Sequence, residues 1–119
     1  MSSSKAGAAG EKYAAKYLKK QGYEIRRVNY RIRTGEIDII AAKGDVLVFC
    51  EVKLRSRTDF GTPAEAVTPR KIGKILSAAK YYMYENGSEE MARFDIVEVY
   101  KSGISYKINH IEDAFTERL

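Results

Sequence analysis

Apolar and polar residues alternate along two stretches of the chain, on either side of Lys43-Gly44-Asp45. A period of two is typical of β-strands, and a glycine between two such runs indicates a tight turn. We therefore predict a hairpin over Gly35–Lys53. Since successive strand side chains point to opposite faces, Glu36, Asp38 and Ile40 should share one face of the sheet. The opposite face is expected to carry Ile37, Ile39 and Ala41.

The remaining periodicity predicts helices and strands on both sides of this hairpin. Predicted helices run from about Gly10 to Gln21 and from Thr68-Pro69 to Asn86-Gly87, and the predicted strands are Tyr23–Arg33, Arg93–Tyr100 and Ile104–Ile108. The spacing of Asn109 and Glu112 suggests a capped final short helix carrying Ile111, Ala114 and Phe115. The predicted order is α-β-β-β-α-β-β-α, an α/β protein. Asp95 is read as a strand-end residue and His110 as a surface residue at the last cap.

Length and composition narrow the class of protein. The 119 residues predict a single domain over 1–119, with residues 1–8 flexible. No apolar run is long enough to cross a bilayer or to act as a secretory signal, which favours a cytoplasmic protein without a membrane partner. One cysteine and one histidine exclude a zinc site of Cys and His ligands from one chain, so a bound metal should be Mg²⁺ or Mn²⁺. The net charge of +5 favours an anionic partner.

Charged residues stand inside the predicted hairpin among core residues. Asp38 lies on its first strand, and Glu51 and Lys53 share a face of its second strand. Two interpretations remain open at this point: a salt-bridge cluster at the solvent end of a sheet, or a divalent-metal site with a lysine beside it. Glu11 borders the inward stripe of the first helix and could reach the sheet, although an acid in a first helical turn is also favourable by itself.

Basic residues gather in three places. The predicted nucleic-acid contacts are Arg31 and Arg33 on a strand, Arg55 and Arg57 on the loop that follows Lys53, and Arg70, Lys71 and Lys74 in the first turns of the second helix. Cations at a helix start oppose the helix dipole, and a bound anion would resolve that conflict. A charged edge strand, a surface loop and a lysine-rich helix face are the structural alternatives.

A series of motifs in order resembles a known family over nearly the whole chain. The segments are GEKYAAKYL, NYR, GEIDII, FCEVKLR, FGTPAEAV and RFDIV. They resemble the bacterial YraN-like family of uncharacterised proteins, which is similar to Holliday-junction resolvases of the PD-(D/E)XK nuclease superfamily. The resemblance implies a restriction-endonuclease-like core, a mixed five-stranded sheet flanked by helices. It also implies that Glu11, Asp38, Glu51 and Lys53 occupy the catalytic positions, with Ile37 in place of the superfamily's proline.

These expectations lead to one main hypothesis and two alternatives. The main hypothesis is a metal-dependent endonuclease acting on DNA, branched or damaged DNA included, in which Asp38, Glu51 and the carbonyl of Val52 hold Mg²⁺ or Mn²⁺, with Glu11 and Glu36 as further candidates. Resolvase-like relatives work as dimers, which makes a homodimer an expectation. The first alternative is a non-catalytic nucleic-acid-binding or adaptor module on the same scaffold. The second is a protein-interaction role for the basic surface.

Overall fold

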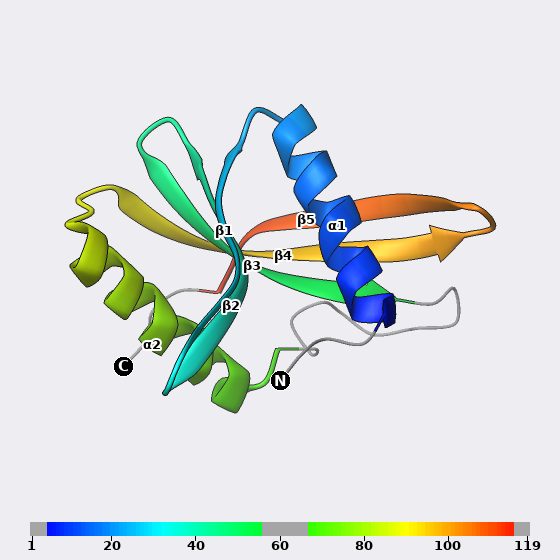
Figure 1. Ribbon diagram of the computed structural model, residues 1–119. Helices are drawn as coiled ribbons and strands as arrows, with labels where there is room; N and C mark the ends of the chain where they lie inside the picture. The colour runs from blue at the N-terminus through cyan, green and yellow to red at the C-terminus, as the bar shows by residue number, and fades with distance from the viewer. Residues whose placement is uncertain (1–4, 56–66, 116–119) are drawn as a thin grey trace.

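Two helices and five strands make up residues 5–55 and 67–115, the part of the chain that this computed structural model describes (Figure 1). In chain order they are α1 (Lys5–Lys20), β1 (Glu24–Ile32), β2 (Gly35–Lys43), β3 (Val46–Arg55), α2 (Pro69–Asn86), β4 (Met91–Ser102) and β5 (Ser105–Phe115). Helix α1 begins before Gly10, so residues 5–8, predicted to be flexible, are helical. The hairpin turn at Gly44 is confirmed, since the glycine adopts a left-handed φ of 60°.

All five strands belong to one sheet in the order β1-β2-β3-β4-β5. Strands β3 and β4 are parallel, and the other neighbours are antiparallel. Helix α2 provides the crossover that two parallel neighbours need. Figure 1 shows α1 and α2 on opposite sides of a strongly twisted sheet, with the β4–β5 hairpin projecting beyond it. The mixed five-stranded sheet flanked by helices is therefore confirmed.

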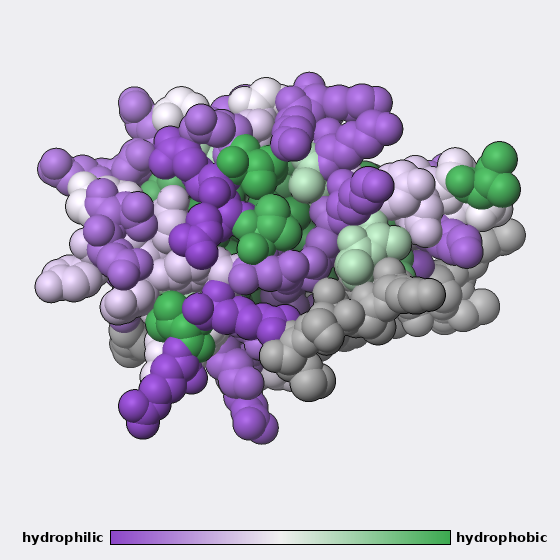
Figure 2. Space-filling model, viewed as in Figure 1, coloured by the Kyte–Doolittle hydropathy of each residue, from purple (hydrophilic) through white to green (hydrophobic). Residues whose placement is uncertain are grey.

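Each helix buries an apolar stripe against its own face of the sheet. On the α2 side, Ile75 and Tyr82 pack in a core with Phe49 of β3. On the α1 side, Ala14 and Leu18 pack in a second core. Hydrophilic side chains cover most of the face seen in Figure 2, interrupted by a few apolar patches. No helix within the described ranges is long and apolar enough to cross a membrane.

The limits of α2 follow from its end residues, as predicted. The Thr68 hydroxyl accepts the backbone N–H of Lys71 at 3.2 Å, and Pro69 takes the first helical position. A proline loses nothing there, because the first backbone N–H groups of a helix have no partner within it. Gly87 ends the helix with a left-handed φ of 58°, and its N–H is directed to the last carbonyls.

The predicted final helix is wrong, because β5 continues as a strand to Phe115. Ile111 pairs with Ile96 of β4, and the Phe115 ring stacks on Phe94 at 5.3 Å. Asn109 does not cap a helix but donates a hydrogen bond to Glu98 across the strand pair, at 2.9 Å. Partners on β4 thus decide the conformation of this segment, and a local capping pattern could not reveal them.

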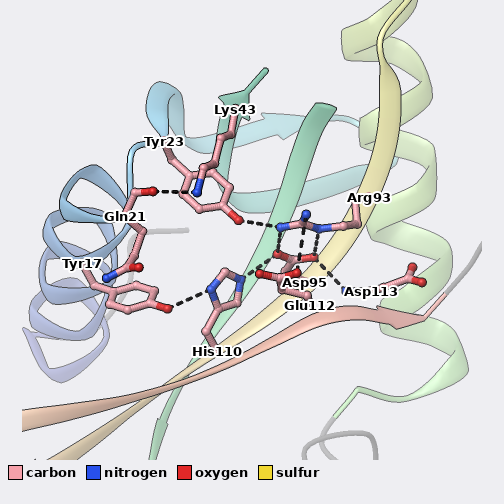
Figure 3. Close-up of polar contacts among 9 residues, drawn as sticks. All are labelled: Tyr17, Gln21, Tyr23, Lys43, Arg93, Asp95, His110, Glu112 and Asp113. Carbon is pink, nitrogen blue, oxygen red and sulfur yellow. Dashed lines mark hydrogen bonds and ion pairs between the residues drawn. The ribbon is translucent and has the colours of Figure 1, made fainter. Parts of the chain in front are cut away.

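Asp95 is not the strand-end residue that was predicted, and His110 is not on the surface. Asp95 is fully buried in β4. Its carboxylate accepts two hydrogen bonds from Arg93, at 2.8 and 2.9 Å, and one from the Asp113 N–H, at 3.0 Å (Figure 3). It also lies 2.7 Å from His110 Nε2. His110 Nδ1 in turn meets the Tyr17 hydroxyl at 3.1 Å. The network therefore joins α1 to β4 and β5 through charged and polar groups.

Candidate functional site

The candidate site begins where β2 and β3 separate. Their ladder of paired residues ends at Ile39 and Cys50, so the backbone of β3 beyond this point has no β2 partner. The Asp38 carboxylate fills the gap by accepting the Val52 N–H at 2.8 Å. Because the N–H and C=O of one strand residue point to the same side, the Val52 carbonyl is directed towards the same gap.

The strict alternation predicted for β2 breaks at Asp38. Ile37 and Ile40 both belong to the α2-side core, whereas Ile39 lies in the α1-side core. Asp38 stands opposite Asn29 of β1, which adopts a left-handed φ of 53°, uncommon for a residue other than glycine. The break in alternation lies at the position where β2 loses its β3 partner, so Asp38 stands at the end of the β2–β3 ladder.

Glu51 is a buried carboxylate with incomplete partners. Its side chain is 4% exposed, and its Oε2 lies 3.6 Å from Lys53 Nζ and 3.7 Å from Lys71 Nζ. Both separations exceed a good hydrogen bond. Its other oxygen, Oε1, is buried and has no hydrogen-bond partner among residues 5–55 and 67–115. Burial, followed by the neighbouring Asp38 carboxylate, raises the pKa of Glu51 to about 7 in spite of the two lysines.

Glu11 approaches this centre from α1. The helix packs on β3 at Gly10, where a Cβ would lie 3.6 Å from Leu54 and 4.0 Å from Val52, in ordinary van der Waals contact. Glu11 is buried, and burial and the charge of Asp38 raise its pKa, while a hydrogen bond with Asn29 opposes the rise. The predicted approach of Glu11 to the sheet is therefore observed.

The structure does not bring three acids into one cage. Within residues 5–55 and 67–115, no group of three or more His, Cys, Asp or Glu side chains is placed to hold a metal ion together. The Asp38 carboxylate acts through its charge on both Glu51 and Glu11 and raises the pKa of each. Two carboxylates and the Val52 carbonyl are hard oxygen donors, and the unpartnered Oε1 of Glu51 fits a site for Mg²⁺ or Mn²⁺. The assignment of metal ligands stays a prediction.

The basic residues have different surroundings. Arg55 is engaged in an ion pair with the buried Glu98, at 3.2 Å from Nε, which gives it a structural role. Lys71, predicted to grip a backbone, reaches Glu51 instead. Arg70 is exposed at the start of α2, and Arg57 lies outside the described residues. Arg31, Arg33 and Lys74 lie around one hollow of about 150 Å³ beside the β1–β2 turn.

Sequence reasoning missed the second lysine of the centre and the partners of Asp95. A signal for Lys71 existed, since cations in the first turns of α2 oppose the helix dipole and need an anion. The expected anion was a bound phosphate, whereas the structure supplies Glu51. Asp95 was predicted to be a strand-end residue, and its partners on β5, His110 and Asp113, could not be read from spacing.

Taken together, the fold and the site define an α/β protein with a mixed sheet between two helices and two neighbouring carboxylates where the β2–β3 ladder ends. A family model described as "Uncharacterised protein family UPF0102" matches residues 10–99. The chain belongs to the UPF0102 family.

Full-length relatives agree with the family match. A UPF0102 protein from Alkaliphilus oremlandii is 49% identical over 114 residues, which cover 93% of this chain and 97% of the relative. Another, from Clostridioides difficile, is 44% identical over 116 residues, covering 97% and 100%. A third, from Christiangramia forsetii, is 41% identical over 109 residues and covers 92% of both chains. The resemblance to the YraN-like family is thereby confirmed over nearly the whole chain.

Proposed function

We propose that this protein is a metal-dependent endonuclease that hydrolyses phosphodiesters of DNA, with branched or damaged DNA as its substrate class. The observation that carries the proposal is Glu51, a buried carboxylate with an unpartnered oxygen and a raised pKa beside a second carboxylate, Asp38. A buried carboxylate whose hydrogen bonding is incomplete is costly, and such groups gather at functional sites. A divalent cation would offset that cost.

Asp38, Glu51 and the Val52 carbonyl would hold the metal ion. A Mg²⁺ or Mn²⁺ ion bound there would polarise the phosphate group and lower the pKa of a bound water. Hydrolysis adds one water across a P–O bond, so the water oxygen bonds to phosphorus and the leaving oxygen takes a proton. Lys53, whose side chain is 30% exposed, lies close enough to orient the water or to stabilise charge on the phosphoryl oxygens.

The direct test is cleavage of a panel of linear, single-stranded, flap and four-way DNA substrates with Mn²⁺. We expect cleavage by the wild type, its loss in Asp38→Asn, and a decrease of roughly a hundredfold to a thousandfold in Lys53→Ala. Glu85→Gln is the matched control, because Glu85 is exposed on α2. Unchanged cleavage in Asp38→Asn would reject the assignment.

A second candidate is a nucleic-acid-binding module without chemistry. The observation in its favour is that Lys53 and Lys71 both lie beside Glu51 and partly neutralise it without a metal. Calorimetric titration with Mn²⁺ separates the two candidates. If the protein is a nuclease, the wild type should bind Mn²⁺ and Glu51→Gln should not. If it is a binding module, neither protein should bind Mn²⁺, and both should bind DNA in a salt-dependent way.

A further inference from the structure

We propose that the hollow at the β1–β2 turn binds one backbone phosphate of a nucleic-acid strand, next to the phosphate that lies at Asp38 and Glu51. We call this space the turn hollow, and the charged residues that line it are Arg31, Arg33, Glu36 and Lys74. The inference rests on the proposed function and adds a second contact point on the substrate. A nuclease with this contact requires a strand that continues beyond the bond it cuts.

The turn hollow is held in shape by contacts between the turn and α2. Gly35 lies so close to the helix that a Cβ there would overlap the carbonyl oxygen of Lys74. Beside it, the hydroxyls of Thr34 and Ser77 form a hydrogen bond of 2.6 Å. Only a glycine allows this approach, so the cations of the turn and of α2 are fixed on either side of one space.

The size of the turn hollow selects a small ligand. Its volume of about 150 Å³ is about five times the share of one water in the liquid. Pockets for drug-sized molecules are larger, at roughly 300 to 1,000 Å³. A phosphate group with a few waters fits this space, and a whole nucleoside does not.

The charges around the turn hollow favour an anion. Arg31, Arg33 and Lys74 contribute three cations and Glu36 one carboxylate. All three cations are exposed, and no ion pair with another described residue occupies Arg33 or Lys74. Guanidinium groups match phosphate oxygens with two parallel hydrogen bonds. Glu36 opposes the anion, so its removal should strengthen binding.

Strand β2 and helix α2 each carry residues of both the turn hollow and the candidate metal site, so the two sites are neighbours. Glu36 precedes Asp38 by two residues of β2, a separation of roughly 7 Å along a strand. Lys74 follows Lys71 by one helical turn, and Lys71 Nζ lies 3.7 Å from Glu51. This spacing is comparable to that between neighbouring phosphates, so one strand can occupy both places.

The test measures binding of a fluorescein-labelled single-stranded oligonucleotide without metal, across a range of salt concentrations. We expect Arg33→Gln and Lys74→Gln each to weaken binding roughly threefold to tenfold and to lower the slope of log K against log salt by about 0.7. Glu36→Gln should strengthen binding. Lys107→Gln, which removes an exposed lysine on β5, is the matched control and should leave both quantities nearly unchanged.

Two results would overturn the inference. One is an equal loss of affinity in Arg33→Gln, Lys74→Gln and Lys107→Gln, which would mean diffuse attraction by a basic surface. The other is an NMR titration in which inorganic phosphate shifts the amides of Thr34 and Gly35 equally with and without bound oligonucleotide, since the hollow would then take free phosphate and not the strand. Binding is measured without metal, so a failure of catalysis leaves this test intact, and normal cleavage together with either of these two results rejects the turn hollow alone.

Discussion

Asp95 and Glu51 are both buried carboxylates on neighbouring parallel strands, yet their surroundings are opposite. The Asp95 carboxylate accepts two hydrogen bonds from Arg93 and one from the Asp113 N–H, and it contacts His110 Nε2, all at 2.7 to 3.0 Å. Burial alone raises the pKa of Asp95, but the hydrogen bonds from His110 and Arg93 outweigh it and leave the pKa below its usual value. Glu51 has two lysines at 3.6 and 3.7 Å, one unpartnered oxygen and a pKa raised to about 7.

The difference shows which acid holds the fold and which is available for a ligand. Asp95 has its hydrogen-bonding capacity filled by protein groups of β4 and β5, so a ligand would find little left to bind. Glu51 lacks such partners, and its ionised form is disfavoured until a cation arrives. Proteins accept such a cost mainly at functional sites, where stability is exchanged for activity. The contrast therefore supports a metal at Glu51 and a structural role for Asp95.

The largest expected effect breaks the satisfied cluster. Replacing Arg93 by methionine leaves the Asp95 carboxylate buried without its strongest partner, and breaking a buried ion pair typically costs about 3 to 5 kcal/mol. We expect the free energy of unfolding in urea to fall by that amount. The matched control is Arg26→Met, because Arg26 also pairs with an acid two residues away on its strand, Glu24, at 2.7 Å, but on the surface. That variant should change stability by less than about 1 kcal/mol. Equal losses in both variants would contradict the role given to Asp95.

The next effect concerns the pH dependence of stability. The pKa of Glu51 is about 7 in the folded protein, whereas in the unfolded chain it has its ordinary value of 4.5. Between these values only the folded state is protonated, so stability should fall as pH rises through this window, by an amount of the order of 2 to 3 kcal/mol. Urea unfolding from pH 4.5 to 8 measures this change.

Glu51→Gln tests the source of that decrease. Glutamine carries no charge at any of these pH values, so the variant should lose most of the fall in stability. A smaller decrease in the same direction should remain, because the pKa of Glu11 is also raised. The exposed Glu85→Gln should keep the wild-type profile. If Glu51→Gln keeps it as well, the pKa assigned to Glu51 is wrong.

The regular parts of the fold could be predicted because local patterns and tertiary packing agree there. The hairpin at Gly44 and the helix between Thr68 and Gly87 have turn and cap residues that favour these local structures over others. The segment from Asn109 to Phe115 failed because partners on β4 overrode its capping pattern. Strand propensity depends on the neighbouring strand, and that neighbour is not visible in the segment itself.

The site could be predicted in part. Alternation placed Asp38 and Glu51 near each other, because both lie on a hairpin whose turn was recognisable. Alternation could not show that the β2–β3 ladder ends at Ile39 and Cys50, where Asp38 accepts the Val52 N–H. Nor could it show that Lys71 reaches Glu51, because this contact depends on how α2 packs on the sheet.

The smallest expected effect sharpens the contrast at Glu51. Lys71 lowers the pKa of Glu51, so Lys71→Gln should raise that pKa above its value in the wild type. Below about pH 6 Glu51 is protonated in both proteins, and stability should change by no more than about 0.5 kcal/mol. NMR titration of the Glu51 side-chain carbonyl measures the shift. Lys74→Gln is the matched control, since it removes an exposed lysine one turn further along α2. An equal shift in both variants would show that the pKa of Glu51 responds to the overall charge of α2 and not to the contact with Lys71.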